Sequence, residues 1–213
     1  MSDKLNAERA LIFRITHRDN VPWILDHGIH CGSTALRDPH YVTIGNPDLI
    51  VTRATRNIPI RPHGTLSDYV PFYFAPYSPM MLNIKTGYGG ITKRANEEIV
   101  IMASSLPRLK QMAVPFVFSN KHAYLKTAAF YSNLADLTSI DWTILQNRDF
   151  KRDINDLEKV ERYQAEALVF KNCPVAALLH IGCFSEGVRQ TVESAIEERA
   201  LELKVSVQRG WYF

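Results

Sequence analysis

The 213-residue sequence lacks long hydrophobic runs, and no stretch approaches the roughly 20 apolar residues that a membrane-spanning helix needs. Residues 1–9 do not have the basic and then apolar order of a secretory signal. Cysteine is scarce, and the spacing of Cys31, Cys173 and Cys183 is not that of a metal site, which favours buried or idle thiols. We therefore expect a cytoplasmic protein with no membrane segment and no metal.

The signatures of several well-marked enzyme classes are also missing. There is no GxGxxG, P-loop, HExxH or GxSxG motif, and the seven histidines have no ligand spacing. Charge of one sign is not in large excess either, since a net charge of +3 permits contact with nucleic acid without arguing for it. Function must therefore be argued from individual residues.

Short apolar strands and helices fill the chain. With 46% hydrophobic residues and no repeat or long linker, residues 1–213 are enough for one domain with a sizeable core. Apolar runs predict strands at 11–15, 68–74, 99–103, 115–118, 165–170, 177–184 and 204–207. Helical spacing and end signals predict helices at 19–28, 80–84, 106–112, 123–130 and 187–203. This mixture is typical of an α+β fold.

Residues 31–66 follow neither periodicity and are rich in turn-forming residues. A long irregular stretch inside a compact domain is often a binding loop or a lid, and we predict that role here.

Glu166 stands out because it lies inside an apolar strand, where an unpaired carboxylate is costly to bury. Gln164 lies two residues earlier, and positions two apart on a strand share a face. The two side chains can therefore address one substrate together. The alternative is that both face solvent on a half-exposed strand.

Arg14 interrupts the first apolar strand, and Thr16 lies on the same face. An arginine beside a hydroxyl suits a phosphate or ribose, although an edge-strand arginine reaching to solvent explains it equally well. In the aromatic strand 68–74, alternation places Tyr69 and Tyr73 on one face. That face either stacks on a flat ring or packs in the core.

These features occur in an order that resembles the mono-ADP-ribosyltransferases: an arginine on the first strand, a central aromatic strand and a late Gln-x-Glu strand. Longer strings are more specific, and they resemble the DarT family of DNA ADP-ribosyltransferase toxins over nearly the whole chain. These strings are ITHRDN (15–20), DYVPFYF (68–74), SPM (78–80), PFVF (115–118), QAE (164–166) and the final WYF (211–213).

The resemblance implies a mono-ADP-ribosyltransferase-like fold, with two packed short-stranded sheets around an NAD cleft and flanking helices. It implies a toxin that transfers ADP-ribose from NAD onto a base of single-stranded DNA, thymidine being the first expectation, with release of nicotinamide. NAD is then the co-substrate, and no metal takes part. The implied partner is a DarG-like macrodomain antitoxin that removes the modification.

The resemblance also implies roles for individual residues. The family's catalytic glutamate corresponds to Glu166, and its catalytic arginine lies before the aromatic strand, where Arg53 is favoured and Arg56 competes. Arg14 stands where the family has histidine and is similar to the arginine of cholera-toxin-like transferases. Contacts to NAD are expected from Arg14, Thr16, Tyr69, Tyr73 and Gln164.

The charged stretch 142–163 precedes Gln164 directly and corresponds to the acceptor-recognition loop of the transferases. Its basic residues are expected to contact phosphates and its aromatic residues to stack on bases. The expected DNA contacts are His122, Arg56, Arg148, Lys151, Arg152 and Tyr163, with Trp142 and Phe150 as further stacking candidates.

Two other functions remain open from the sequence. The first is an NAD-dependent transferase acting on RNA or protein, although a glutamine at 164 argues against arginine acceptors. The second is a non-catalytic nucleic-acid-binding module on a decayed transferase fold.

Overall fold

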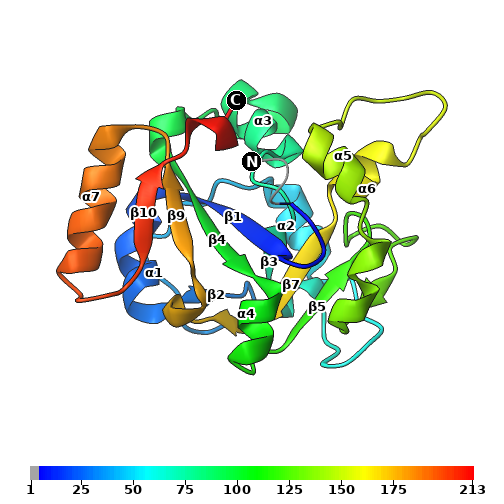
Figure 1. Ribbon diagram of the computed structural model, residues 1–213, viewed down its shortest axis with the longest axis horizontal. Helices are drawn as coiled ribbons and strands as arrows, with labels where there is room; N and C mark the ends of the chain where they lie inside the picture. Colours follow the sequence, from blue (N-terminus) through cyan, green and yellow to red (C-terminus); the bar gives the residue numbers. More distant parts are fainter. Residues whose placement is uncertain (1–4) are drawn as a thin grey trace.

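The computed structural model describes residues 5–213, which form a large eight-stranded sheet surrounded by helices (Figure 1). The strand order is β10-β9-β4-β1-β3-β7-β5-β6, and β2 (Ile29–His30) pairs with β8 (Asn172–Cys173) in a separate small sheet. The strands of the large sheet are β1 (Leu11–His17), β3 (Tyr69–Tyr73), β4 (Ile99–Ser105), β5 (Phe116–Ser119), β6 (Phe130–Tyr131), β7 (Glu166–Phe170), β9 (His180–Cys183) and β10 (Lys204–Val207). β9 and β10 are parallel, and the other neighbours are antiparallel.

The large sheet has two halves that meet at a narrow junction. The first half holds β10, β9, β4 and β1, and the second half holds β3, β7, β5 and β6. Seven residue pairs join β1 to β4 and five join β3 to β7, whereas one pair, Phe13 with Tyr73, joins β1 to β3. The predicted α+β class is confirmed, but the predicted two packed sheets are replaced by one mixed sheet with this narrow junction.

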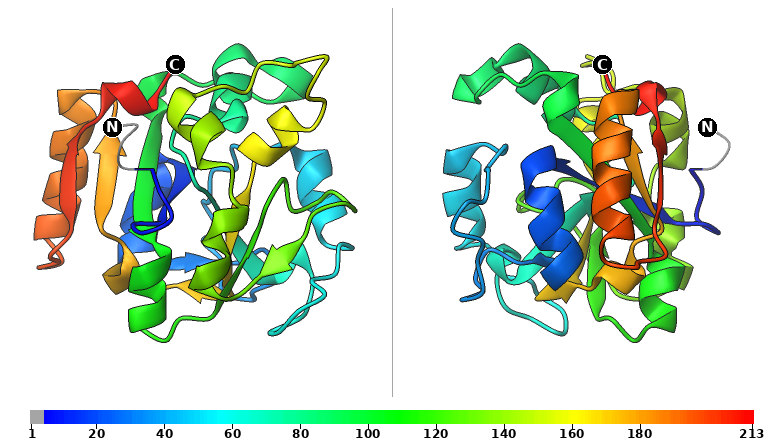
Figure 2. Two further views of the ribbon diagram at one scale, coloured as in Figure 1. Left: turned by 45° about the vertical axis from the view of Figure 1, so that its right-hand side comes forward. Right: turned by 90° about the vertical axis from the view of Figure 1, so that its left-hand side faces the viewer.

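Helices flank both halves of the sheet. They are α1 (Val21–His27), α2 (Pro47–Arg53), α3 (Pro79–Thr86), α4 (Leu106–Gln111), α5 (Trp142–Asn147), α6 (Lys159–Tyr163) and α7 (Glu186–Glu197). α1 and α7 lie beside the first half, and α5 and α6 lie beside the second (Figure 1). Figure 1 shows the segment between α5 and α6 extending away from the rest of the molecule, and the left view of Figure 2 turns the same yellow-green loop toward the viewer.

Residues with capping side chains fix where four of these helices begin. Asn46, Ser78, Ser105 and Asp141 each accept a hydrogen bond from a backbone N–H in the first turn, at the starts of α2, α3, α4 and α5. A proline in the first turn of α2, α3 and α4 adds a residue whose φ already suits a helix. Gly87 ends α3 with a φ of +76°, which only glycine adopts without strain.

The core of the first half is strongly apolar. All seven residues of β4 are buried, and its first five are hydrophobic. α7 buries Val188, Val192 and Ile196, which recur every four residues along one face of the helix. Apolar burial at these periods explains why the sequence predicted both elements.

Three predictions about local structure need correction. Residues 123–130 form no helix and are irregular as far as β6. Residues 31–66 are mostly irregular, as expected, but they contain α2, whose start carries the recognisable signal Asn46-Pro47. The predicted strand at 165–170 begins at Glu166, after α6 ends with Gln164 as its C-cap. The remaining predicted strands and helices are present; β10 has the predicted bounds and the others have shifted ends.

Candidate active site

Glu166 is the first residue of β7, and its side chain is only 1% exposed to solvent. In the ladder between β3 and β7 it lies opposite Tyr73, and Tyr73 also pairs with Phe13 of β1. The carboxylate that the sequence singled out therefore lies where the two halves of the sheet meet.

Three groups from two other segments contact this carboxylate. Arg53, the last residue of α2, places Nη1 3.0 Å from Oε2 and 3.3 Å from Oε1. His122 places Nδ1 3.2 Å from Oε1, and the backbone N–H of Ala123 donates to the same oxygen at 3.0 Å. A buried charge is tolerated when it has partners of this kind, so the four residues form one polar cluster inside the protein.

These contacts set the protonation state of Glu166. Burial alone raises the pKa of a carboxyl group, because it disfavours the charged form. Here the charge of Arg53, followed by His122 and the N–H of Ala123, outweighs burial and lowers the pKa of Glu166 from 4.5 to about 2. Glu166 is therefore an anion at neutral pH.

The structure separates the two arginines that the sequence left in competition. Arg53 contacts Glu166, whereas Arg56 directs Nη2 to the carbonyl oxygen of Leu125 at 3.0 Å and lies 6.0 Å from the centre of the Phe130 ring. Arg53 thus belongs to the polar cluster, and Arg56 holds the irregular segment that follows β5.

His122 lies against Glu166, although the sequence had suggested it only as a DNA contact. Its position depends on the irregular segment 120–129, where the N–H of His122 donates to the carbonyl of Glu161 at 2.9 Å. Neither strand nor helix periodicity marks this segment, so spacing gave no signal that His122 and Glu166 come together.

Two guanidinium groups offer unsatisfied donors beside Tyr73. Arg14 donates from Nη1 to the carbonyl of Pro71 at 2.9 Å, but its Nε is buried and has no hydrogen-bond partner within residues 5–213. Nη2 of Arg53 is also buried and also has no hydrogen-bond partner within residues 5–213. Burial raises the pKa of Tyr73, and Glu166, Arg53 and Arg14 are the charges that act on its hydroxyl. Free cationic donors next to a hydroxyl and an anion fit the phosphates and ribose of a dinucleotide.

Two expected NAD contacts are engaged elsewhere. Thr16 is buried, and its Oγ1 accepts a hydrogen bond from Nδ2 of Asn20 at 3.1 Å. Gln164 is the C-cap of α6, and its Nε2 donates to the carbonyl of Val160 at 3.2 Å. The expectation that Gln164 and Glu166 share a strand face is wrong, because the backbone at Gln164 is not extended.

Tyr69 lies at the opposite end of β3 from Tyr73. It pairs with Phe170, four residues along the ladder from the Tyr73–Glu166 pair, which is about 13 Å at the usual rise of a strand. Its ring is buried in a small apolar cluster, and its hydroxyl donates to the carbonyl of His63 at 2.7 Å. The two tyrosines share a face, but the structure does not bring Tyr69 to Glu166.

The stretch 142–163 contains both packed and exposed candidates for DNA contact. Tyr163 is buried and donates from its hydroxyl to the carbonyl of Tyr77 at 2.7 Å, so it has no free face for a base. Trp142 and Phe150 likewise pack against the core. Arg148 lies over the ring of Tyr77 at 4.8 Å.

Lys151 and Arg152 are exposed in the segment between α5 and α6. The charges around them are largely paired within the protein. Arg162 contacts Asp141 and Asp156, and Lys159 contacts Asp149. Arg148, Lys151 and Arg152 are the candidates of this stretch that are exposed to solvent.

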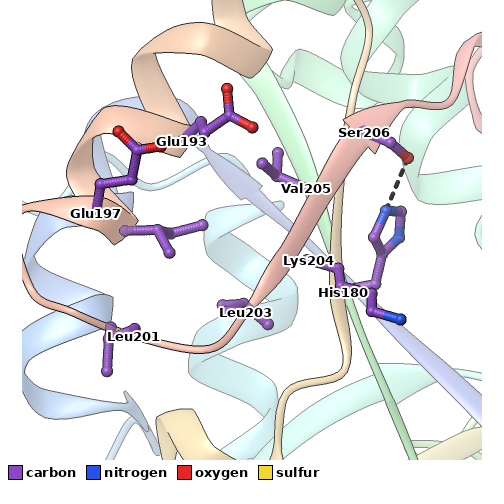
Figure 3. Close-up of a pocket in the computed structure, with 9 residues that line it drawn as sticks. His180, Glu193, Glu197, Leu201, Leu203, Lys204, Val205 and Ser206 are labelled. Atoms are coloured by element: carbon purple, nitrogen blue, oxygen red, sulfur yellow. Dashed lines mark hydrogen bonds between the residues drawn. The ribbon is translucent and has the colours of Figure 1, made fainter.

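No helix within residues 5–213 is long and apolar enough to cross a bilayer. That part of the chain also contains no cluster of three or more His, Cys, Asp and Glu side chains suited to a metal. A groove of about 470 Å³ lies between α7 and β10, lined by Glu193, Glu197, Lys204 and His180 among others (Figure 3). None of its lining residues belongs to the Glu166 cluster.

Known proteins resemble the chain over almost its whole length. The family model described as ssDNA thymidine ADP-ribosyltransferase, DarT, matches residues 13–213. A DNA ADP-ribosyl transferase of Escherichia coli O127:H6 is 51% identical over 212 residues, covering 100% of this chain and 97% of the relative. The fold and site thus define an NAD-dependent ADP-ribosyltransferase that acts on DNA. The chain belongs to the DarT family.

Solved structures of a relative have the same fold. The structure of Thermus sp. 2.9 DarT in complex with ADP-ribosylated ssDNA has a TM-score of 0.89 at 30% identity and covers 97% of both chains. The structure of the same protein in complex with NAD+ has a TM-score of 0.79 at 29% identity, over 97% of this chain and 98% of that one. This relative thus shares the fold over almost the full length of the chain.

Proposed function

We propose that the protein is a toxin that transfers ADP-ribose from NAD to thymidine in single-stranded DNA, with Glu166 as its catalytic carboxylate and Arg53 as its catalytic arginine. The observation that carries the proposal is the buried Glu166 anion, held by Arg53 and His122 at the junction of the two halves of the sheet. The membership in the DarT family and the complexes of the Thermus relative with NAD+ and with modified DNA support it.

The low pKa of Glu166 suits an electrostatic role. NAD supplies a glycosidic bond to a good leaving group, nicotinamide, and positive charge develops on the ribose as that bond breaks. A fixed anion in a water-poor site stabilises such charge strongly, because it needs no reorganisation during the reaction. Glu166 supplies this anion without first losing a proton at neutral pH.

Glu166 becomes a stronger base only when Arg53 moves away. With a pKa of about 2, its carboxylate is a weak proton acceptor while the guanidinium lies 3.0 Å away. Removing that charge raises the pKa, because burial is then opposed only by His122 and the N–H of Ala123. Glu166 therefore acts first as an anion, and it accepts the proton of the attacking base once Arg53 has turned toward the acceptor.

For NAD binding we propose Arg14, Tyr73 and the free donor of Arg53, because their unsatisfied groups surround Glu166. Thr16, Tyr69 and Gln164 are not proposed as NAD contacts, because their side chains hydrogen-bond to other groups of the protein. Paired bases hide their ring nitrogens, so a transferase that attacks through one needs an unpaired strand. We propose that Lys151 and Arg152 contact its phosphates, because both are basic and exposed to solvent.

We also propose that residues 1–213 act as one catalytic domain in the cytoplasm, where NAD and DNA are both present. A DarG-like macrodomain antitoxin is the proposed partner, because the chain belongs to the DarT family, whose toxins the resemblance pairs with such an antitoxin. The acceptor is proposed to be DNA rather than RNA or protein, in line with the Escherichia coli relative. A decayed, non-catalytic module is disfavoured by the intact Arg53–Glu166 pair.

The Glu166→Gln variant tests the proposal. We expect transfer to fall by about 100-fold or more, because a preorganised charge is removed from the reacting ribose. The assay incubates the protein with NAD and single-stranded oligonucleotides that contain or lack thymidine, and mass spectrometry reads the added ADP-ribose. Glu193→Gln on α7 is the control and keeps full activity. Undiminished modification by Glu166→Gln would remove Glu166 from the mechanism.

A further inference from the structure

Lys121 is a buried lysine whose ammonium group has a partner on a different segment. Its side chain is 9% exposed, and Nζ lies 3.0 Å from Oε1 of Glu158, a half-exposed residue just before α6. Moving a buried ammonium away from this opposite charge is costly, so the backbone at Lys121 is held to the position of Glu158. This pair joins the segment after β5 to the end of the segment between α5 and α6, which is called the 148–158 segment below.

The two residues after Lys121 are the ones that hold Glu166. The ring of His122 and the N–H of Ala123 both contact Oε1 of Glu166, at 3.2 and 3.0 Å. A second bond, from the N–H of His122 to the carbonyl of Glu161 at 2.9 Å, ties the same short segment to α6. Residues 121–123 thus reach α6 on one side and the carboxylate on the other.

From this geometry we propose that Lys121 is a positioning residue that couples the 148–158 segment to Glu166. The Lys121–Glu158 ion pair fixes residues 121–123 so that His122 and Ala123 hold the carboxylate. A strand bound on the 148–158 segment would then stabilise the carboxylate in its reactive orientation through this pair. The inference rests on the proposed function, since it takes 148–158 as the surface that receives DNA.

The test uses Glu158→Gln, which removes the charge but keeps an amide oxygen that can accept a hydrogen bond from Nζ of Lys121, and thermal melting checks that the variant is folded. The matched control is Glu161→Gln, which makes the same change of charge on α6 and keeps the backbone carbonyl that His122 uses. We expect Glu158→Gln to lower kcat for DNA modification by about five- to tenfold, with KM for NAD unchanged. Glu161→Gln keeps the wild-type kcat.

A double-mutant cycle with His122→Ala shows whether the effect passes through this segment. If it does, Glu158→Gln changes kcat by less than twofold once His122 is alanine. The proposal is overturned if Glu158→Gln behaves like Glu161→Gln, if its full effect persists in the His122→Ala background, or if only KM for DNA changes. Failure of the proposed function itself looks different, because the wild-type protein would then leave DNA unmodified.

Discussion

The two halves of the large sheet differ in what they bury. In the first half, β1 and β4 share seven residue pairs, and β4 is buried along its whole length. In the second half, β7 begins with a buried glutamate, and the segment after β5 buries a lysine. Apolar groups need only close packing, whereas buried charges need partners in defined positions. The first half is therefore suited to hold the fold, and the second half to hold the chemistry.

The largest effect on stability is expected from Ile101→Ala in the centre of β4. Ile101 is fully buried, and the cavity left by truncation costs about 2–5 kcal/mol of the free energy of unfolding. Urea denaturation measures the loss, and kcat per folded molecule stays unchanged because Ile101 lies opposite Ile15 in the β1–β4 ladder and outside the Glu166 cluster. Leu179→Ala, at an exposed position, changes little. A fall in kcat for Ile101→Ala at full folding would show that the halves are not separable in this way.

The next effect concerns activity and compares Arg53→Gln with Arg56→Gln. Arg53 contacts Glu166 and Arg56 does not, so we expect kcat/KM to fall by about 100-fold in the first variant, the size seen when one preorganised group is lost. The Arg56 variant loses less than about tenfold. Initial rates of base modification give both values. Equal losses would return Arg56 to the site as an equal candidate.

A smaller effect is expected from Gly182→Ala, because a Cβ at this position would lie 2.5 Å from the ring of Trp211. That ring packs edge-on against Phe13, the residue that joins the two halves. Overpacking of this kind costs about 1–3 kcal/mol. Gly187→Ala in α7 is the control, since no atom lies within 4 Å of its new Cβ. Thermal melting compares the two, and a variant at 182 as stable as the wild type would show that Trp211 can move without cost.

The sequence predicted those strands and helices in which the spacing of the apolar residues matches the spacing of the buried positions. β4 and α7 follow from apolar patterns, and Glu166 was recognised because a charge interrupts such a pattern. The same patterns failed at residues 123–130, where Arg56 donates a hydrogen bond to the carbonyl of Leu125 and Glu166 accepts one from the N–H of Ala123. These bonds fix an irregular path despite helix-forming alanines. Tertiary contacts decided the local structure there.

The sequence predicted Glu166 as a site residue, but it did not show which other side chains contact Glu166. Arg53 and Arg56 are three residues apart in a loop-like stretch, and only the end of α2 decides which guanidinium reaches Glu166. His122 reaches Glu166 from 44 residues away in sequence, through an irregular segment that carries no period. Contacts made by such segments depend on the folded path of the chain and leave no pattern in the sequence.

Helix α2 contains no fully buried residue, although its last residue, Arg53, carries the charge that neutralises Glu166. All seven residues of α2 are exposed or half-buried, so the helix adds little to the apolar core. The charge balance at Glu166 and the stability of the fold are thus carried by different elements, and a change in the exposed residues of α2 can alter the first with little effect on the second.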